Sequence, residues 1–404
     1  MRLLSPRRAT AGVVALAVSA GALMLASAPS TSPTDATSLR AVGAATDFLA
    51  TYVELDGRVA RLDQGGDTVS EGQAYAMLLA VSIADEDRFR AVWEWTASHL
   101  QRDDGLLAWR WRDGDVVDGG AASDGDLLTA WALGLAGIRF GDDALTREAK
   151  RVAGSVVELE TVPLERGAGR MLVAGPWATT EAVANPSYLV LRAMSQLWWI
   201  TGDSTWAGIA AAARTAIGVN MAAPPHLPSD WATLDGAPAA APDATGPRFG
   251  YDAARVLVQL ATDCDPAGRA AAAEAWPFFE RADAGDTDDT GDTDGIGGTG
   301  DTDGIGAVYS LQGDRLEPAR HPVVLVAAAA AADAAGDEEA ASRLLDDADD
   351  LDDEFPTYYG SAWIALTRIW LDTEALGRCS GPGSTEGPAS AAATRKARRS
   401  GGGR

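Results

Sequence analysis

SDGDLLTAWALGLAGI, residues 123–138, is apolar on almost every side once it is wound into a helix. Its apolar positions point all round the helix axis: Leu127, Leu128, Ala130, Trp131, Leu133, Leu135, Ala136 and Ile138. A helix of this kind has to be covered on all sides. The helical segments at 203–218 and 337–349 are instead apolar on one face and charged on the other. The chain therefore combines enclosed helices with amphipathic ones.

Helical periodicity recurs along the whole chain, while strand signals are nearly absent. Twelve helices are predicted, at 38–54, 70–83, 86–100, 123–139, 142–158, 186–201, 203–218, 249–262, 266–280, 320–335, 337–349 and 359–374. Short connections predict six antiparallel pairs, in which the even-numbered helices are enclosed by the odd-numbered ones. The expected fold is all-α, an (α/α)6 barrel or toroid of six helical hairpins.

In such a barrel all six inner helices begin at the same end. That end collects five residues with chemical potential: Glu71, Asp124, Tyr188, Asp252 and Tyr358. A helix start directs free backbone N–H groups outward and usually lies at a rim. Two carboxylates that face one cleft are the minimum for acid/base hydrolysis of an acetal.

Five short segments around this end form recognisable motifs. They are Ser70-Glu71-Gly72-Gln73-Ala74-Tyr75, Ala122-Ser123-Asp124-Gly125-Asp126, Asn185-Pro186-Ser187-Tyr188, Gly250-Tyr251-Asp252-Ala253-Ala254-Arg255 and Tyr358-Tyr359. In order and in helical context they resemble glycoside hydrolase family 8 (cellulase family D), especially endo-β-1,4-glucanases encoded beside bacterial cellulose synthases. The connecting segment Ala108-Trp109-Arg110-Trp111 also resembles a pattern of that family. The resemblance runs from about residue 45 to residue 372.

The resemblance implies a role for each acid. Glu71 resembles the general acid, Asp252 the general base and Asp124 the residue that holds and distorts the sugar at the cleavage point. The family inverts the anomeric centre, which requires the acid and base carboxyls to lie about 6.5–9.5 Å apart. Without the family context, helix capping explains acids at helix starts equally well. Asp126 is interpreted as a cap or as support behind the site.

Charge physics adds a condition. A helix N-terminus stabilises an anion, which suits Asp252 as a base but opposes Glu71 as an acid. Burial of Glu71 or the charge of Asp124 has to raise the pKa of Glu71 if it is to stay protonated.

Candidate substrate-binding residues are Trp111, Asn185, Tyr188, Tyr251, Arg255 and Tyr358. The family resemblance makes Trp111 the first aromatic candidate, because it matches an AWxW pattern. Trp109, Trp177 and Trp231 also lie in connecting segments, whereas the helical tryptophans are interpreted as core. Arg255 follows Asp252 by three residues, so it either binds sugar or pairs with that acid.

Composition excludes several classes. The net charge of −25 disfavours a nucleic-acid partner, because phosphate binding needs clustered cations. Only three histidines are present, without paired cysteine ligands or an HExxH motif. No metal and no cofactor are therefore expected, and the partner is a β-1,4-linked polysaccharide.

The chain divides by composition. Residues 1–28 have the pattern of a signal peptide, with arginines followed by an apolar run and small residues, which predicts a secreted, extracellular protein without a stable membrane anchor. Residues 29–37 form a Ser/Thr/Pro-rich linker and 38–378 the glycosidase domain. A low-complexity Asp/Gly/Thr insertion occupies 283–306, and 379–404 are predicted to be a disordered basic tail. The expected state is a monomer.

Two points stay open at this level. Cys264 and Cys379 either form a disulfide or remain free thiols. The 283–306 insertion is either a disordered surface segment or a weak calcium site, since it carries oxygen ligands at alternate positions.

The leading functional hypothesis is a secreted, inverting endo-β-1,4-glucanase that hydrolyses internal bonds of cellulose-like glucan. The first alternative keeps the machinery but changes the polymer, giving a chitosanase, xylanase or lichenase. The second alternative is a non-catalytic carbohydrate-binding toroid. Loss of an acid at position 71 or 252 would favour the last of these, and both acids are present.

Overall fold

A computed structural model describes residues 33–164, 169–285 and 304–377. Six helices form a closed inner ring: α2 (Ser70–Ser82), α4 (Ser123–Phe140), α7 (Leu191–Thr201), α9 (Tyr251–Ala261), α12 (Pro322–Ala335) and α14 (Tyr358–Asp372). Each of them packs on the next, and α14 packs on α2. The ring therefore closes on itself.

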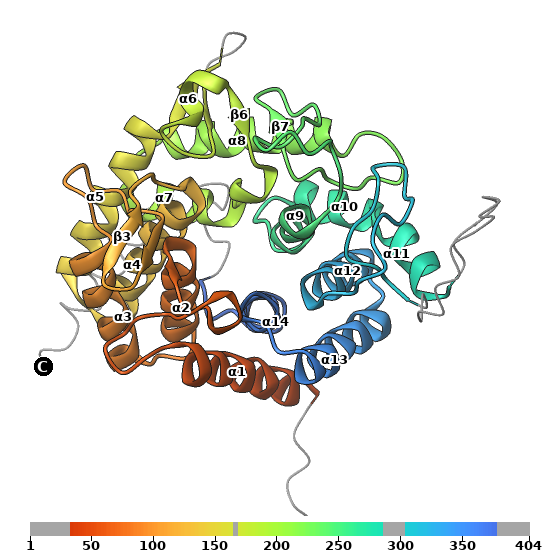
Figure 1. Cartoon of the computed structure of the whole chain (residues 1–404), viewed down its shortest axis with the longest axis horizontal. Coiled ribbons are helices and arrows are strands. Elements are labelled where there is room, and N and C mark those ends of the chain that lie inside the picture. Colours follow the sequence, from red (N-terminus) through yellow and green to blue (C-terminus); the bar gives the residue numbers. More distant parts are fainter. Residues whose placement is uncertain (1–32, 165–168, 286–303, 378–404) are drawn as a thin grey trace, which may run out of the picture.

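A second layer surrounds this ring. It contains α1 (Pro33–Tyr52), α3 (Glu86–His99), α5 (Asp143–Leu159), α8 (Thr205–Asn220), α10 (Pro266–Glu274), α11 (Trp276–Asp283) and α13 (Glu338–Glu354). Consecutive inner and outer helices pair, and the first helix, α1, packs against the last, α14. Figure 1 shows α14 in the inner ring, with α1 and α13 on its outer side. The predicted (α/α)6 barrel is confirmed.

The core follows from the two helix types. In α12 the run from Pro322 to Ala332 is buried, because small and branched apolar side chains cover the whole helix surface. In α4, Trp131 is buried and its indole N–H donates to Gln196 Oε1 on α7 at 2.8 Å. This bond satisfies the one polar group of a large core side chain.

Helix boundaries differ from the prediction by more than two residues at four places. Helix α13 continues to Glu354, five residues beyond its predicted end at 349. The segment 266–280 is two helices, because α10 ends at Glu274 and α11 begins at Trp276 with Pro277 in its first turn. The segment 186–201 begins as a 3₁₀ turn at Pro186–Tyr188, and α7 starts only at Leu191. Helix α1 begins at Pro33, so it includes part of the predicted 29–37 linker.

In the described part of the chain, seven short strands form three small sheets beside the barrel, which the prediction missed. They are β1 (Thr68–Val69), β2 (Arg110–Arg112) and β3 (Asp115–Asp118), then β4 (Thr161–Pro163) with β5 (Arg170–Leu172), and β6 (Val183–Ala184) with β7 (Ala232–Thr233). Strands of two to four residues are too short for alternation to register in the sequence.

Several predictions fall outside the described residues: the signal peptide, most of the 283–306 insertion and the 379–404 tail. Cys264 is disulfide-bonded, and the other cysteine of the chain, Cys379, lies outside the described part. Within the described part, no helix has both the length and the hydropathy for a membrane span. Among the same residues, no three His, Cys, Asp or Glu side chains are placed so that they could hold a metal ion together.

Candidate active site

Three carboxylic acids lie in the first turns of inner helices: Glu71 on α2, Asp124 on α4 and Asp252 on α9. None of them is the N-cap residue of its helix. Those N-cap positions are taken by residues without a side-chain capping bond, namely Val69, Ala122 and Gly250. Simple capping therefore does not account for the acids.

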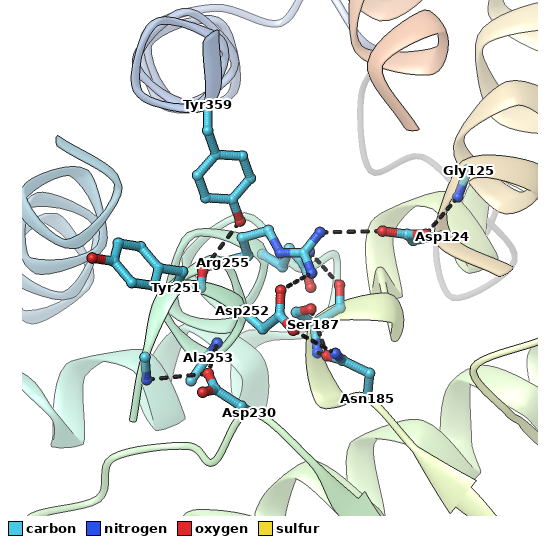
Figure 2. Close-up of polar contacts among 12 residues, drawn as sticks. Asp124, Gly125, Asn185, Ser187, Asp230, Tyr251, Asp252, Ala253, Arg255 and Tyr359 are labelled. Atoms are coloured by element: carbon cyan, nitrogen blue, oxygen red, sulfur yellow. Dashed lines mark hydrogen bonds and ion pairs between the residues drawn. The ribbon is translucent and has the colours of Figure 1, made fainter. Parts of the chain in front are cut away.

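Arg255 joins two of these acids. Its Nη1 donates to Asp124 Oδ2 at 3.1 Å and its Nη2 to Asp252 Oδ1 at 2.7 Å (Figure 2). Nη1 also lies 3.2 Å from the hydroxyl of Tyr75. The guanidinium side chain is only 5% exposed. A planar, permanently charged fork in this position fixes the two carboxylates relative to each other.

Asp252 has a second partner. Asn185 Nδ2 donates to Asp252 Oδ2 at 2.9 Å. The amide is itself oriented, because its Oδ1 accepts from the backbone N–H and the hydroxyl of Ser187 at 3.0 and 2.6 Å. The Asp252 side chain is 36% exposed, whereas that of Asp124 is 4% exposed. Asp252 thus accepts a hydrogen bond at each carboxylate oxygen and still faces solvent.

Glu71, unlike Asp252, lies in surroundings that favour the protonated carboxyl. Burial of the carboxyl, and after it the charge of Asp124, raises its pKa to about 8. Its Oε2 is buried and accepts no hydrogen bond from the described residues. The condition set by the sequence, burial or a neighbouring charge, is met by both effects. Glu71 is therefore protonated near pH 7 and able to donate a proton.

Asp124 is buried beside these groups. Burial raises its pKa and the Arg255 cation opposes that rise. The backbone N–H of Gly125 donates to its Oδ1 at 2.9 Å. Gly125 also sets the distance between two inner helices. A Cβ at this position would lie 2.5 Å from Ser70 Oγ and 3.1 Å from the backbone nitrogen of Glu71.

Gly125→Ala is expected to push the first turns of α2 and α4 apart, and thereby to separate Glu71 from Asp124. The overpacking costs about 1–3 kcal/mol of folding free energy and lowers activity. Gly154→Ala on α5 is the matched control, because nothing lies within 4 Å of its added Cβ. That variant gains about 0.5–1 kcal/mol from helix propensity. Thermal unfolding measures the stability of the two variants, and hydrolysis rates measure their activity. If both variants have the same stability and activity, the Cβ of residue 125 does not push α2 and α4 apart.

Two further acids lie behind Asp124. Asp126 Oδ1 accepts the backbone N–H of Leu107 at 2.7 Å, which confirms its interpretation as support. Glu160 is fully buried, and neither of its carboxyl oxygens has a hydrogen-bond partner among the described residues. Burial raises the pKa of both acids well above the usual range. No local pattern marks Glu160, so sequence reasoning missed it.

Asp230 was also missed, and it holds the helix that carries Asp252. Its Oδ1 accepts the backbone N–H groups of Gly250 at 3.1 Å and Ala253 at 2.9 Å (Figure 2). Arg248 Nε donates to its Oδ2 at 3.3 Å. Burial, and after it the charge of Asp252, raises the pKa of Asp230 to about 6. It is a capping acid supplied by a distant loop, which is why no capping motif precedes α9.

Asp230→Ala is expected to leave two N–H groups of α9 without an acceptor. The loss costs about 0.5–2 kcal/mol of stability, as for other caps, and the shift of Asp252 lowers activity about 10- to 100-fold. Asp265→Ala is the control, because Asp265 caps the outer helix α10 through the N–H of Ala267 at 3.0 Å. That variant loses comparable stability and keeps its activity. Equal activity losses in the two variants refute a specific role for Asp230.

The aromatic candidates differ in their contacts and in their exposure to solvent. Trp111 on β2 is partly exposed, packs its edge on Trp95 and has the Arg58 guanidinium 5.2 Å from its ring centre. Its strand pairs with β1, which leads directly into α2. Tyr188 is partly exposed, with Arg255 5.5 Å from its ring centre.

Of the other two tyrosine candidates, Tyr251 is partly exposed and Tyr358 is buried. Tyr251 packs edge-on against His321, and its carbonyl accepts from the hydroxyl of Tyr359 at 3.1 Å (Figure 2). Tyr358 is only 2% exposed, and its hydroxyl lies opposite Gly72, one residue from Glu71. Sugar binding by these residues stays a prediction.

The chain is similar in sequence and in fold to known proteins. A sequence model of glycosyl hydrolases family 8 matches residues 16–290. A probable endoglucanase of Novacetimonas hansenii is 35% identical over 218 residues, which are 52% of this chain and 63% of that protein. The chain thus aligns with less than two thirds of this relative's length.

Solved structures cover more of the chain. The endo-β-1,4-glucanase CMCax of Acetobacter xylinum has a TM-score of 0.65 at 27% identity, over 81% of this chain and 97% of that one. A β-1,3-1,4-glucanase of Paenibacillus sp. X4 has a TM-score of 0.72 at 18% identity, over 85% and 94% of the two chains. At that identity the likeness concerns the fold alone.

Proposed function

This chain belongs to glycosyl hydrolases family 8, and from that premise we propose that it is an endo-β-1,4-glucanase that inverts the anomeric centre of its substrate. The observation that carries the proposal is the contrast between two acids at one mouth of the barrel. Burial raises the pKa of Glu71 so that it keeps its proton, whereas Asp252 is partly exposed and accepts hydrogen bonds from Arg255 and Asn185.

In the proposed reaction Glu71 donates its proton to the glycosidic oxygen as the bond to the anomeric carbon breaks. Asp252 takes a proton from the water that attacks this carbon from the opposite face. Asp124, whose charge acts on Glu71, and Arg255, which joins Asp124 to Asp252, bind the sugar at the cleavage point. The water supplies the new hydroxyl, so the product leaves with inverted configuration.

Cellulose-like glucan is the proposed substrate because relatives at 27–35% identity are described as endoglucanases. Xylan, mixed-linkage glucan and chitosan are the alternatives, and the Paenibacillus glucanase shares the fold. We also propose that the protein acts outside the cell, on the basis of the signal-like residues 1–28.

The test is release of reducing ends from amorphous cellulose, carboxymethylcellulose, xylan, mixed-linkage glucan and chitosan, with Glu71→Gln as the inactive reference. Proton NMR of the first product resolves its anomer. We expect that the protein hydrolyses cellulose and that the first product is released as the α-anomer. A β-anomer overturns the inverting mechanism, a preference for another polymer changes the substrate, and no turnover of any polymer overturns the enzyme assignment.

A further inference from the structure

Two acids behind the site, Asp126 and Glu160, are completely buried. Asp126 is in the first turn of α4, two residues after Asp124, and Glu160 is the C-cap residue of α5. Three of their four carboxyl oxygens, Asp126 Oδ2 and both oxygens of Glu160, have no hydrogen-bond partner among the described residues. A buried carboxylate without a donor or a cation is strongly destabilising. Two fully ionised carboxyl groups at these positions are therefore not a stable arrangement.

The cations in the surroundings are bound elsewhere. The charged groups that act on both acids are Asp124, Arg102 and Asp104. Arg102 donates to Asp104 Oδ2 at 2.7 Å and to a backbone carbonyl at 2.7 Å. Arg170 on β5 donates to the carbonyl of Thr161, the residue after Glu160, at 2.7 Å. The guanidinium groups of the described residues thus leave the two carboxyl groups without an ion-pair partner.

A proton between the two acids satisfies these oxygens. An ionised carboxyl group only accepts hydrogen bonds, whereas a protonated one also donates. The charge of Asp126 has the largest effect on Glu160 after burial, so the two groups are close neighbours. Like charges at such a site favour a proton on one of them, and burial favours it further. Burial raises the pKa of both acids well above the ordinary range, in agreement with this argument.

The two acids are also tied to the part of α4 that carries Asp124. The backbone N–H of Val173 donates to the carbonyl of Glu160 at 2.9 Å. The carbonyl of Val173 accepts from the hydroxyl of Ser123, the residue before Asp124, at 2.6 Å. Asp126 lies on the same turn. A bond between Glu160 and Asp126 therefore joins the end of α5 to the first turn of α4 a second time, through side chains.

We propose that Asp126 and Glu160 share a proton in a direct hydrogen bond between their carboxyl groups, and that this pair positions Asp124 against Arg255. Without the proton the two charges repel, which forces the end of α5 away from the first turn of α4. With it the same contact becomes a bond. The positioning role rests on the proposed function, because that function gives Asp124 its task. The shared proton does not rest on it.

The proton is tested by urea unfolding of wild type and of the double variant Asp126→Asn/Glu160→Gln over a range of pH. The two amides keep the hydrogen bond but do not titrate. The ordinary pKa of Glu160 is 4.5. Above that value the folded wild type holds a proton that its unfolded chain has lost, so stability is lost as pH rises. We expect the folding constant of wild type, relative to that of the variant, to fall about tenfold per pH unit.

Glu158→Gln is the matched control, because residue 158 is exposed on the same helix, α5. Its folding constant relative to wild type is expected to be independent of pH in this range. Asp126→Asn and Glu160→Gln are measured singly as well, so that the result does not depend on the folding of one variant. If the folding constants of wild type and the amide variants keep a constant ratio above pH 4.5, no proton is shared.

The positioning role is tested by the activity of Glu160→Met and Glu160→Gln. Methionine fills a similar volume but leaves Asp126 Oδ2 without a donor, and kcat/KM is expected to fall about 10- to 100-fold as Asp124 shifts. Glutamine restores most of this loss, because its amide N–H donates to Asp126. Equal activity of the two variants refutes the positioning role. A wild-type protein that cleaves no β-1,4 glucan overturns the proposed function instead, and the unfolding experiment still decides whether the proton is shared.

Discussion

Glu71→Gln is expected to lower hydrolysis by about 10²- to 10⁴-fold, the usual contribution of a general acid. The amide keeps the shape of the side chain but has no acidic proton to give to the leaving oxygen. In the wild-type protein activity falls as pH rises through about 8, because the pKa of Glu71 is raised to that value by burial and by Asp124. The residual activity of the variant lacks this basic limb.

The pH dependence of folding stability is an independent test of the raised pKa of Glu71. The pKa of Glu71 rises from an ordinary 4.5 to about 8 on folding. Between these values the folded protein binds more protons than the unfolded chain, so stability falls as pH rises across that window. Glu71→Gln removes this contribution, and Glu94→Gln at an exposed position on α3 leaves it in place. Urea unfolding between pH 4.5 and 8 measures the difference. If the activity of Glu71→Gln still falls as pH rises through about 8, the assignment of Glu71 as the general acid is wrong.

Arg255→Met is expected to cost about 3–5 kcal/mol, because it leaves buried carboxylate charge without a partner. Activity falls at the same time, since Asp124 and Asp252 lose the group that fixes their separation. Arg255→Lys keeps the charge but replaces the planar fork, so it recovers more stability than activity. Urea unfolding and kcat/KM separate the two effects.

The matched control is Arg90→Met. Arg90 also bridges two acids, Glu86 at 2.7 Å and Asp142 at 3.0 Å, but its side chain is 39% exposed. Exposed pairs contribute about 0–1 kcal/mol. If the two arginine variants lose similar stability, burial is not what makes the Arg255 bridge important.

Much of the barrel could be predicted from periodicity. Runs of consecutive apolar residues in α4 and α12 show that these helices are enclosed on all sides. The closed inner ring was predicted from this property. The first-turn positions of Glu71, Asp124 and Asp252 also followed from helix starts. The 3₁₀ turn before α7 and the short strands did not, because segments of two to four residues carry too few positions for a period to emerge.

The sequence by itself determined the helices, their inner and outer faces, and the acids at their starts, because these depend on neighbours within one or two turns. Only the tertiary structure decided the state of each acid. Arg255 reaches Asp124 across 131 positions, and Asp230 caps α9 from a separate loop. The buried, unpartnered Glu160 likewise has no local signal. Burial and charge act through space over a few ångströms, so a pKa and a shared guanidinium depend on which distant segments meet.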